Sequence, residues 1–256
     1  MESFCFKQFK VMHGRSAMKV NTDGVLLGAW LTLPSLTTSG KKLEILDIGT
    51  GTGVISLIIA QRLQSISTQS SIFAIDSDGP SATEAQDNFS DSPWPAMLEA
   101  RHLTLQEMAM DNTFENRFDL ITSNPPYFKD SLKAPSVRRS SARHNDNLSY
   151  DTLISSVAKM LKEKSIFSVV LPAEAFEEFI FLAREEGLVP VRICRVKTVS
   201  AGKVKRVLME FKKSCKEDNI IQKDIPAEEL LTIQERGDGP YTNEYRRLTG
   251  DLYLNF

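Results

Sequence analysis

The tetrapeptide Asn124-Pro125-Pro126-Tyr127 combines residues that could bind and activate a planar nitrogen. The lone pair of an exocyclic amine or a carboxamide is delocalised, so such a nitrogen is a poor nucleophile. The Asn124 side-chain oxygen and the Pro125 carbonyl could accept both N–H hydrogens, favouring the pyramidal nitrogen that attacks a methyl group. The two prolines would fix the backbone, and Tyr127 could stack on a flat substrate. We predict these four residues as the catalytic set.

A rigid turn is the alternative interpretation of the tetrapeptide, because Asn-Pro and Pro-Pro are strong loop signals. Its position favours the functional interpretation. The apolar run Phe118-Asp119-Leu120-Ile121 before it predicts a core strand over residues 118–122. Ligands of open α/β sheets bind outside the carboxyl ends of such strands.

A glycine-rich loop, Asp47-Ile48-Gly49-Thr50-Gly51-Thr52-Gly53, lies between an expected strand at 43–46 and an expected helix at 54–60. Glycine lets the backbone approach a nucleoside-containing cofactor closely, and a helix N-terminus follows. The third glycine comes one residue too early for the dinucleotide fingerprint. With an acid two residues before the first glycine, the loop resembles the S-adenosylmethionine loop of class I methyltransferases. We therefore expect Asp47, Gly49 and Gly51 to contact that cofactor.

Other polar residues are candidates for the same cofactor. An expected strand at 72–75 ends at Asp76, whose carboxylate could hold the ribose hydroxyls, with Asp78 as a competitor for that role. A solvated strand-end acid is the alternative. Nearer the N-terminus, Thr22 or Asp23 either caps a short helix over 25–30 or approaches the methionine end of the cofactor.

Alternating strand and helix patterns predict an α/β fold with a mainly parallel, Rossmann-like sheet. Helices are expected at about 81–89, 151–161 and 174–186, and strands at about 101–105, 166–171 and 189–196. An antiparallel last strand is expected at 204–211. We predict an N-terminal segment (1–42) packing on the cofactor site, a core (43–213), and a C-terminal extension (214–256) of the same domain.

Composition indicates a cytoplasmic protein. The 256 residues are 41% hydrophobic, enough for a sizeable core, with no apolar run of transmembrane length and no signal-peptide pattern at the N-terminus. Three cysteines without a C-x-x-C pair disfavour zinc or a disulfide framework. The three histidines are assigned no chemistry. We predict no metal site, and nothing in the sequence suggests an obligatory protein partner.

The net charge of −2 conceals an uneven distribution of basic residues, which are concentrated in 129–144 and 192–213. Both segments should leave carboxyl ends of sheet strands and so flank the catalytic loop. This suits a polyanion whose phosphates lie on the rim; solvated Lys/Arg faces are the alternative. The candidate RNA-binding residues are Lys129, Lys133, Arg138, Arg139, Arg143, Lys203 and Lys205.

Four segments together resemble the bacterial tRNA adenine-N6-methyltransferase family, whose members modify the adenine beside the anticodon of a valine tRNA. They are 18–30 (Met-Lys-Val through Ala-Trp), the glycine loop, 118–127, and 241–254 with its tyrosines. The resemblance implies a class I methyltransferase fold, S-adenosylmethionine as donor and tRNA as substrate. It also implies cofactor contacts at Asp47, Gly49, Gly51 and Asp76.

One departure concerns the position after the third strand, where related enzymes often carry an acid that holds the adenine amine. This sequence has Leu103-Thr104-Leu105-Gln106 there, so Thr104 or Gln106 would substitute.

Three other functions share parts of this pattern. A DNA adenine methylase would normally need a target-recognition insertion. A protein glutamine methyltransferase would normally have a helical domain before the glycine loop, where only 46 residues precede Asp47. A cofactor-sensing RNA-binding protein would not need hydrogen-bond acceptors directed at a reacting nitrogen, such as the Asn124 side-chain oxygen.

Overall fold

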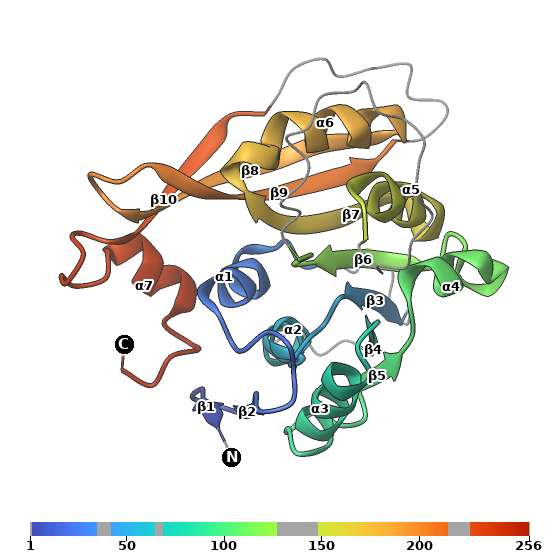
Figure 1. Ribbon diagram of the computed structural model, residues 1–256, viewed down its shortest axis with the longest axis horizontal. Helices are drawn as coiled ribbons and strands as arrows, with labels where there is room; N and C mark the ends of the chain where they lie inside the picture. Colours follow the sequence, from blue (N-terminus) through green and yellow to red (C-terminus); the bar gives the residue numbers. More distant parts are fainter. Residues whose placement is uncertain (1, 35–41, 65–68, 127–147, 215–225, 256) are drawn as a thin grey trace, which may run out of the picture.

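The computed structural model describes residues 2–34, 42–64, 69–126, 148–214 and 226–255. Its main feature is an eight-stranded sheet in the order β10-β8-β9-β7-β6-β3-β4-β5 (Figure 1). The strands are β3 (Leu43–Ile48), β4 (Ser70–Asp76), β5 (Leu98–His102), β6 (Phe118–Ser123), β7 (Leu161–Pro172), β8 (Leu188–Val199), β9 (Val204–Lys213) and β10 (Glu228–Gln234). The expected α/β fold with a mainly parallel sheet is confirmed, since β9 alone runs antiparallel to its neighbours among these strands.

Helices cover both faces of the sheet. They are α1 (Thr22–Trp30), α2 (Val54–Gln64), α3 (Gly79–Ser90), α4 (Leu105–Met110), α5 (Tyr150–Met160), α6 (Phe176–Glu185) and α7 (Asn243–Thr249), with short 3-10 turns η1 (Asn112–Phe114) and η2 (Ala173–Ala175). Figure 1 shows α5 and α6 on one side of the sheet and α1 and α2 on the other. No helix in the described part of the chain is long and apolar enough to cross a membrane.

Alternation along the strands divides the core between the two faces. Ile45 of β3 belongs to the buried cluster that includes α1 and α2, whereas its neighbour Leu46 belongs to the cluster around α5 and α6. Both side chains are fully buried. The continuous apolar run of β3 is therefore that of a strand covered on both faces.

The order of the strands reverses between β3 and β6, which pair in parallel at the centre of the sheet. From β3 the chain proceeds to β4 and β5 on one side, and from β6 to β7 on the other. Such a switch point leaves a crevice at the carboxyl ends of the two strands. The glycine loop follows β3 and Asn124 follows β6, so both enter this crevice.

Several expected boundaries are wrong, and two of them have a clear local cause. The strand expected at 101–105 lies at Leu98–His102, because Thr104 and Glu107 form a capping box that starts α4 instead. The helix expected at 174–186 begins with the 3-10 turn η2 and ends at Glu185, before Gly187 with its φ of +74°. The antiparallel strand expected at 204–211 is confirmed as β9.

The N- and C-terminal segments meet beside α1. The strands β1 (Ser3–Cys5) and β2 (Lys10–Met12) form a short hairpin. Phe6, in the turn between them, forms an isolated antiparallel bridge with Tyr253. The C-terminal segment also supplies β10, which pairs in parallel with β8 and was not expected. Figure 1 shows β1 and β2 near the segment that follows α7.

Candidate active site

A cavity of about 500 Å³ lies at the carboxyl edge of the sheet, over the switch point between β3 and β6. The segments that line it include the glycine loop, the end of β4 with its following turn, residues 103–106, and the segment after β6. Residues 16–19 of the N-terminal loop (residues 13–20) and the starts of α1 and α2 also line it. The cavity thus collects most of the sequence-predicted cofactor residues from distant parts of the chain.

The glycine loop has the left-handed backbone that its residue types predict. Gly49, Gly51 and Gly53 have φ angles of +70°, +56° and +80°. A Cβ on Gly49 would meet no atom within 4 Å, whereas one on Gly53 would lie 2.4 Å from the ring of Phe89. The first glycine therefore leaves open space facing a ligand, and the third allows α3 to pack closely.

Asp47 does not line the cavity, although we expected it to touch the cofactor. Its side chain is fully buried behind the glycine loop, and its Oδ2 accepts hydrogen bonds of 2.7 Å from Thr50 Oγ1 and Ser56 Oγ. Burial raises the pKa of this carboxyl to about 6. Its geometric role is to hold the loop and the start of α2 together.

Asp76, at the end of β4, lines the cavity next to the glycine loop. Its Oδ2 accepts from Gly51 N at 2.8 Å and its Oδ1 from Asp78 N at 2.9 Å, and burial raises its pKa. The Oδ2 of Asp78 is engaged differently, accepting from the amide and hydroxyl of Ser81 as the N-cap of α3. Each carboxylate oxygen has two acceptor sites, so Asp76 retains capacity for ribose hydroxyls.

Asn124 lies directly after β6 with only 9% of its surface exposed. Its Nδ2 points toward Met18 Sδ at 4.0 Å, while its buried Oδ1 has no hydrogen-bond partner among the described residues. Leaving a buried acceptor unpaired costs about 1–3 kcal/mol, which is consistent with a ligand supplying the donor. Pro126 also lines the cavity, Pro125 is buried without lining it, and Tyr127 falls outside the described residues.

The expectation for the cap of α1 is wrong. Asn21 is the N-cap, accepting from Gly24 N at 2.9 Å, because the helix begins one residue earlier than Thr22 could cap it. Asp23 instead forms an ion pair of 2.7 Å with Arg206 of β9, and Thr22 lines a second cavity. Neither Thr22 nor Asp23 lines the cavity beside Asn124.

Residues after β5 form an apolar wall. Leu103 and Leu105 line the cavity together with Ile75, and Thr104 and Gln106 line it as well. The Thr104 hydroxyl is 2.6 Å from Glu107 Oε2 in the capping box, so it already has one partner. Of the two candidates for the missing acid, Gln106 has the side chain that is not part of this cap.

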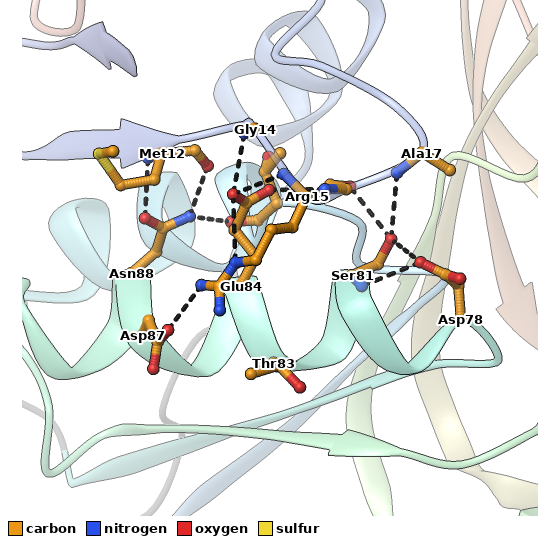
Figure 2. A network of polar contacts seen from close by, with 12 residues as sticks. Met12, Gly14, Arg15, Ala17, Asp78, Ser81, Thr83, Glu84, Asp87 and Asn88 are labelled. Carbon is orange, nitrogen blue, oxygen red and sulfur yellow. Dashed lines mark hydrogen bonds and ion pairs between the residues drawn. The ribbon is translucent and has the colours of Figure 1, made fainter. Parts of the chain in front are cut away.

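Polar side chains on one face of α3 hold the N-terminal loop beside the cavity (Figure 2). The sequence alone did not predict these contacts. Glu84, only 2% exposed, accepts from the backbone amides of Gly14, Arg15 and Ser16 at 2.9, 3.0 and 2.8 Å. Asn88 accepts from Met12 N at 2.8 Å and donates to Met12 O at 2.9 Å. The polar spacing of residues 81, 84 and 88 along α3 is the sequence signal that could have indicated this face.

The basic candidates are only partly described. Lys203 and Lys205 are exposed at the turn from β8 to β9, on the same edge of the sheet as the cavity because β9 runs antiparallel. The remaining five, Lys129, Lys133, Arg138, Arg139 and Arg143, lie outside the described residues.

Comparison with known proteins identifies the family. The methyltransferase small domain family matches residues 21–169. A protein of Bacteroides fragilis named tRNA1(Val) (adenine(37)-N6)-methyltransferase is 41% identical, with 98% of this chain and 97% of that protein covered. Proteins with the same name from Phocaeicola vulgatus (98% and 97% covered) and Flavobacterium psychrophilum (98% and 99%) are 43% and 37% identical. The chain belongs to the bacterial tRNA (adenine-N6)-methyltransferase family.

Solved structures agree on the fold of this methyltransferase. A predicted O-methyltransferase from Agrobacterium tumefaciens aligns with a TM-score of 0.63 at 16% identity, covering 90% of this chain and 96% of that one. A putative class I S-adenosylmethionine-dependent methyltransferase from Listeria monocytogenes aligns with a TM-score of 0.55 at 14% identity, covering 80% and 62%. At these identities the likeness concerns the fold alone.

The residues of the methyltransferase cavity fit S-adenosylmethionine. The apolar wall of Leu103, Leu105 and Ile75 suits an adenine ring, and the Asp76 carboxylate suits a ribose. The left-handed glycines leave room for a ligand beside the backbone. Among the described residues no cluster of His, Cys, Asp or Glu could hold a metal ion.

We expect Asp76→Ala to weaken S-adenosylmethionine binding by about 1.5–3 kcal/mol, the range for a hydrogen bond to a charged group. The variant would lack the carboxylate that we expect to hold the ribose, and it would also lose the hydrogen bond from Gly51 N, which shapes the glycine loop. Isothermal titration calorimetry of the purified variant measures the change. Unchanged affinity would transfer the ribose role to Asp78.

We expect Glu84→Gln to weaken cofactor binding about threefold to tenfold, or about 0.7–1.4 kcal/mol. The amide cannot accept from three backbone N–H groups as the carboxylate does, so the N-terminal loop would no longer be held in one position over the cavity. Thr83→Ala, at an exposed position of the same helix, is the matched control. If a folded Glu84→Gln protein bound the cofactor like the control, the loop would not form a binding wall.

Proposed function

We propose that this methyltransferase transfers the methyl group of S-adenosylmethionine to the exocyclic N6 amine of an adenine in tRNA, at the position beside the anticodon of a valine tRNA. The observation that carries the proposal is the unpartnered, buried Oδ1 of Asn124 at the carboxyl end of β6, next to a cavity suited to the cofactor. The relatives' shared name supports the substrate and the position.

The cofactor supplies an electrophilic methyl group, and the protein supplies orientation and hydrogen-bond acceptors. Asn124 Oδ1 would accept one N–H of the target amine and the Pro125 carbonyl the other, which localises the nitrogen lone pair. These bonds strengthen as the nitrogen becomes pyramidal and positive, so they stabilise the transition state more than the bound amine. The position of Asn124 at the end of a buried central strand keeps the acceptor fixed, so little reorganisation is required.

Several features of the site support specific roles. Asp76 would hold the ribose, with the backbone at Gly49 and Gly51 beside the rest of the cofactor. Tyr127 remains our candidate for stacking on the adenine. Asp47 would act only through the loop it supports.

An RNA substrate also agrees with the basic turn at Lys203 and Lys205, which lies on the edge of the sheet that carries the cavity. Neutralising phosphates at this rim would add affinity that decreases with salt concentration. A tRNA substrate agrees with the cytoplasmic location that the composition of the chain predicts. The relatives' name gives no support to the DNA adenine methylase or the protein glutamine methyltransferase.

The test compares three acceptors with radiolabelled S-adenosylmethionine: unmodified transcripts of several tRNAs, duplex DNA, and a glutamine-containing protein. We expect methyl transfer to a valine tRNA transcript, and nucleoside digestion should give N6-methyladenosine. Other tRNAs, DNA and protein should remain unlabelled. Comparable transfer to DNA or protein would overturn the proposal, and binding without any transfer would favour the non-catalytic RNA-binding alternative.

A further inference from the structure

A second cavity, of about 700 Å³, opens on the other side of the segment that precedes α1. Its walls come from the N-terminal hairpin, the start of α1, the end of β8, β10 and the C-terminal segment. None of the roles described so far uses it. Its aromatic lining residues are Phe4, Tyr241, Tyr245 and Tyr253.

The tyrosines form a rigid stack with one accessible member. Tyr241 is 38% exposed and stacks on Tyr245 with ring centroids 5.1 Å apart. Tyr245 is 2% exposed, stacks on Tyr253 at 6.3 Å, and its hydroxyl lies 3.3 Å from that of Tyr253. The buried ring of Tyr245 holds the orientation of Tyr241, which therefore presents an ordered aromatic surface at the cavity. A purely structural cluster joining the termini would account for Tyr253 but not for the exposure of Tyr241.

The second cavity is next to the first. Asn21 lines both, because the segment containing it separates them. Met18 and Lys19 face the cavity beside Asn124, whereas Val20 and Thr22 face the tyrosines. A polymer bound in one cavity would reach the other by crossing a single segment of chain.

Charge and polarity at this cavity suit a nucleotide. Arg246 lines it, with Nε donating to the backbone carbonyl of Tyr241 at 3.2 Å, so a cation lies at the same wall of the cavity as Tyr241. Gln234 and Thr198 add side chains that can donate and accept hydrogen bonds. Thr198 is also close in sequence to the basic turn at Lys203 and Lys205. A nucleotide bound here could stack its base on the ring of Tyr241 and form hydrogen bonds between the base edge and the side chains of Gln234 and Thr198. Its phosphate could contact the nearby cations.

We propose that this second cavity binds an unpaired nucleotide of the RNA, adjacent in sequence to the methylated adenine, with its base stacked on Tyr241. The inference rests on the proposed function, because it assumes that the target adenine occupies the cavity beside Asn124. Binding two neighbouring bases in separate cavities would hold the loop of the RNA splayed open, which is the form in which single-stranded RNA exposes its base edges.

Photocrosslinking tests the location of the neighbouring base directly. A substrate tRNA transcript with 4-thiouridine at one or the other position flanking the target adenine is irradiated with the native enzyme and S-adenosylhomocysteine. Mass spectrometry of the digested complex should find the crosslink, for one of the two positions, in a peptide containing Tyr241 or Arg246. Crosslinks from both positions confined to other parts of the chain would overturn the proposal.

Substitution tests the energetic role of the ring. We expect Tyr241→Ala to weaken tRNA binding about 5- to 140-fold, the change that corresponds to roughly 1–3 kcal/mol of base stacking. Tyr241→Phe should bind tRNA like the wild type, because the ring is retained. Cofactor affinity should be the same in all three proteins. Phe181→Ala is the matched control, since Phe181 is an exposed aromatic residue (64%) on α6.

The outcomes separate this proposal from the proposed function. If the wild type methylates tRNA and Tyr241→Ala binds and methylates it equally well, the second cavity holds no base although the function stands. If the wild type methylates no RNA, the function itself fails. Loss of self-association in Tyr241→Ala, with tRNA binding intact, would show that a second copy of the chain covers the cavity and would overturn the proposal.

Discussion

Asn124→Ala is expected to lower the single-turnover rate of methyl transfer about 10²- to 10³-fold. The substitution removes an acceptor whose hydrogen bond strengthens as the target nitrogen becomes positive, and loss of one comparable oxyanion-hole donor has a cost of that order. The buried Oδ1 has no competing partner among the described residues, so nothing offsets its removal. The effect should fall on the chemical step. Cofactor affinity should change less than about threefold, or about 0.7 kcal/mol.

Rapid-quench methylation with saturating enzyme measures this rate, and calorimetry measures cofactor binding on the same preparation. Asn112→Ala provides the control, because Asn112 is an exposed asparagine in η1 that does not line the cavity. A folded Asn124→Ala enzyme with a near wild-type rate would eliminate the acceptor mechanism. The tetrapeptide would then be the rigid turn that its prolines also favour.

Asp47 should make the apo protein less stable as the pH rises from 4 to 7. Burial raises the pKa of this carboxyl from 3.8 to about 6 in the folded state. Between these values the folded protein binds more protons than the unfolded chain, so the free energy of unfolding falls with increasing pH. A shift of this size corresponds to about 3 kcal/mol at 1.36 kcal/mol per pKa unit.

Asp47→Asn isolates this contribution, because asparagine has nearly the same shape and does not titrate. Urea denaturation at pH 4, 5, 6 and 7 gives the free energy of unfolding of each protein. The wild type should lose about 2 kcal/mol or slightly more relative to Asp47→Asn between pH 4 and 7, because at pH 4 the unfolded carboxyl is already partly ionised. Asp151→Asn, at an exposed position in α5, should follow the wild type. A constant difference between wild type and Asp47→Asn would show that the buried carboxyl titrates at its ordinary value.

Local sequence patterns were sufficient for the centre of the fold. The apolar run before the glycine loop and the run before Asn124 can be stable only as strands buried on both faces, and they became β3 and β6. The glycines were informative because their left-handed backbone is a property of single residues. Once two parallel strands end side by side, the residues that follow them must meet.

The remaining parts depended on contacts that local patterns do not encode. Asp47 has the same residue type whether it faces the cofactor or lies behind the loop, and only tertiary packing decides between them. Thr104 by itself does not indicate where β5 ends. Its capping box with Glu107 does, because it starts α4. The contacts between Glu84 and the N-terminal loop join residues about seventy positions apart, with no periodicity to indicate the pairing.

The meeting of the two chain ends bears on synthesis by the ribosome. Lys7 N donates to Leu252 O at 2.8 Å, and the ring of Phe6 stacks on that of Tyr253 with centroids 5.9 Å apart. The packing of β1 and β2 is therefore complete only after the segment that contains Leu252 and Tyr253 has been translated. Contacts of such long sequence separation form late in folding. Until then Phe6 lacks the ring of Tyr253, whereas Phe9 of the same hairpin can already pack on Trp94.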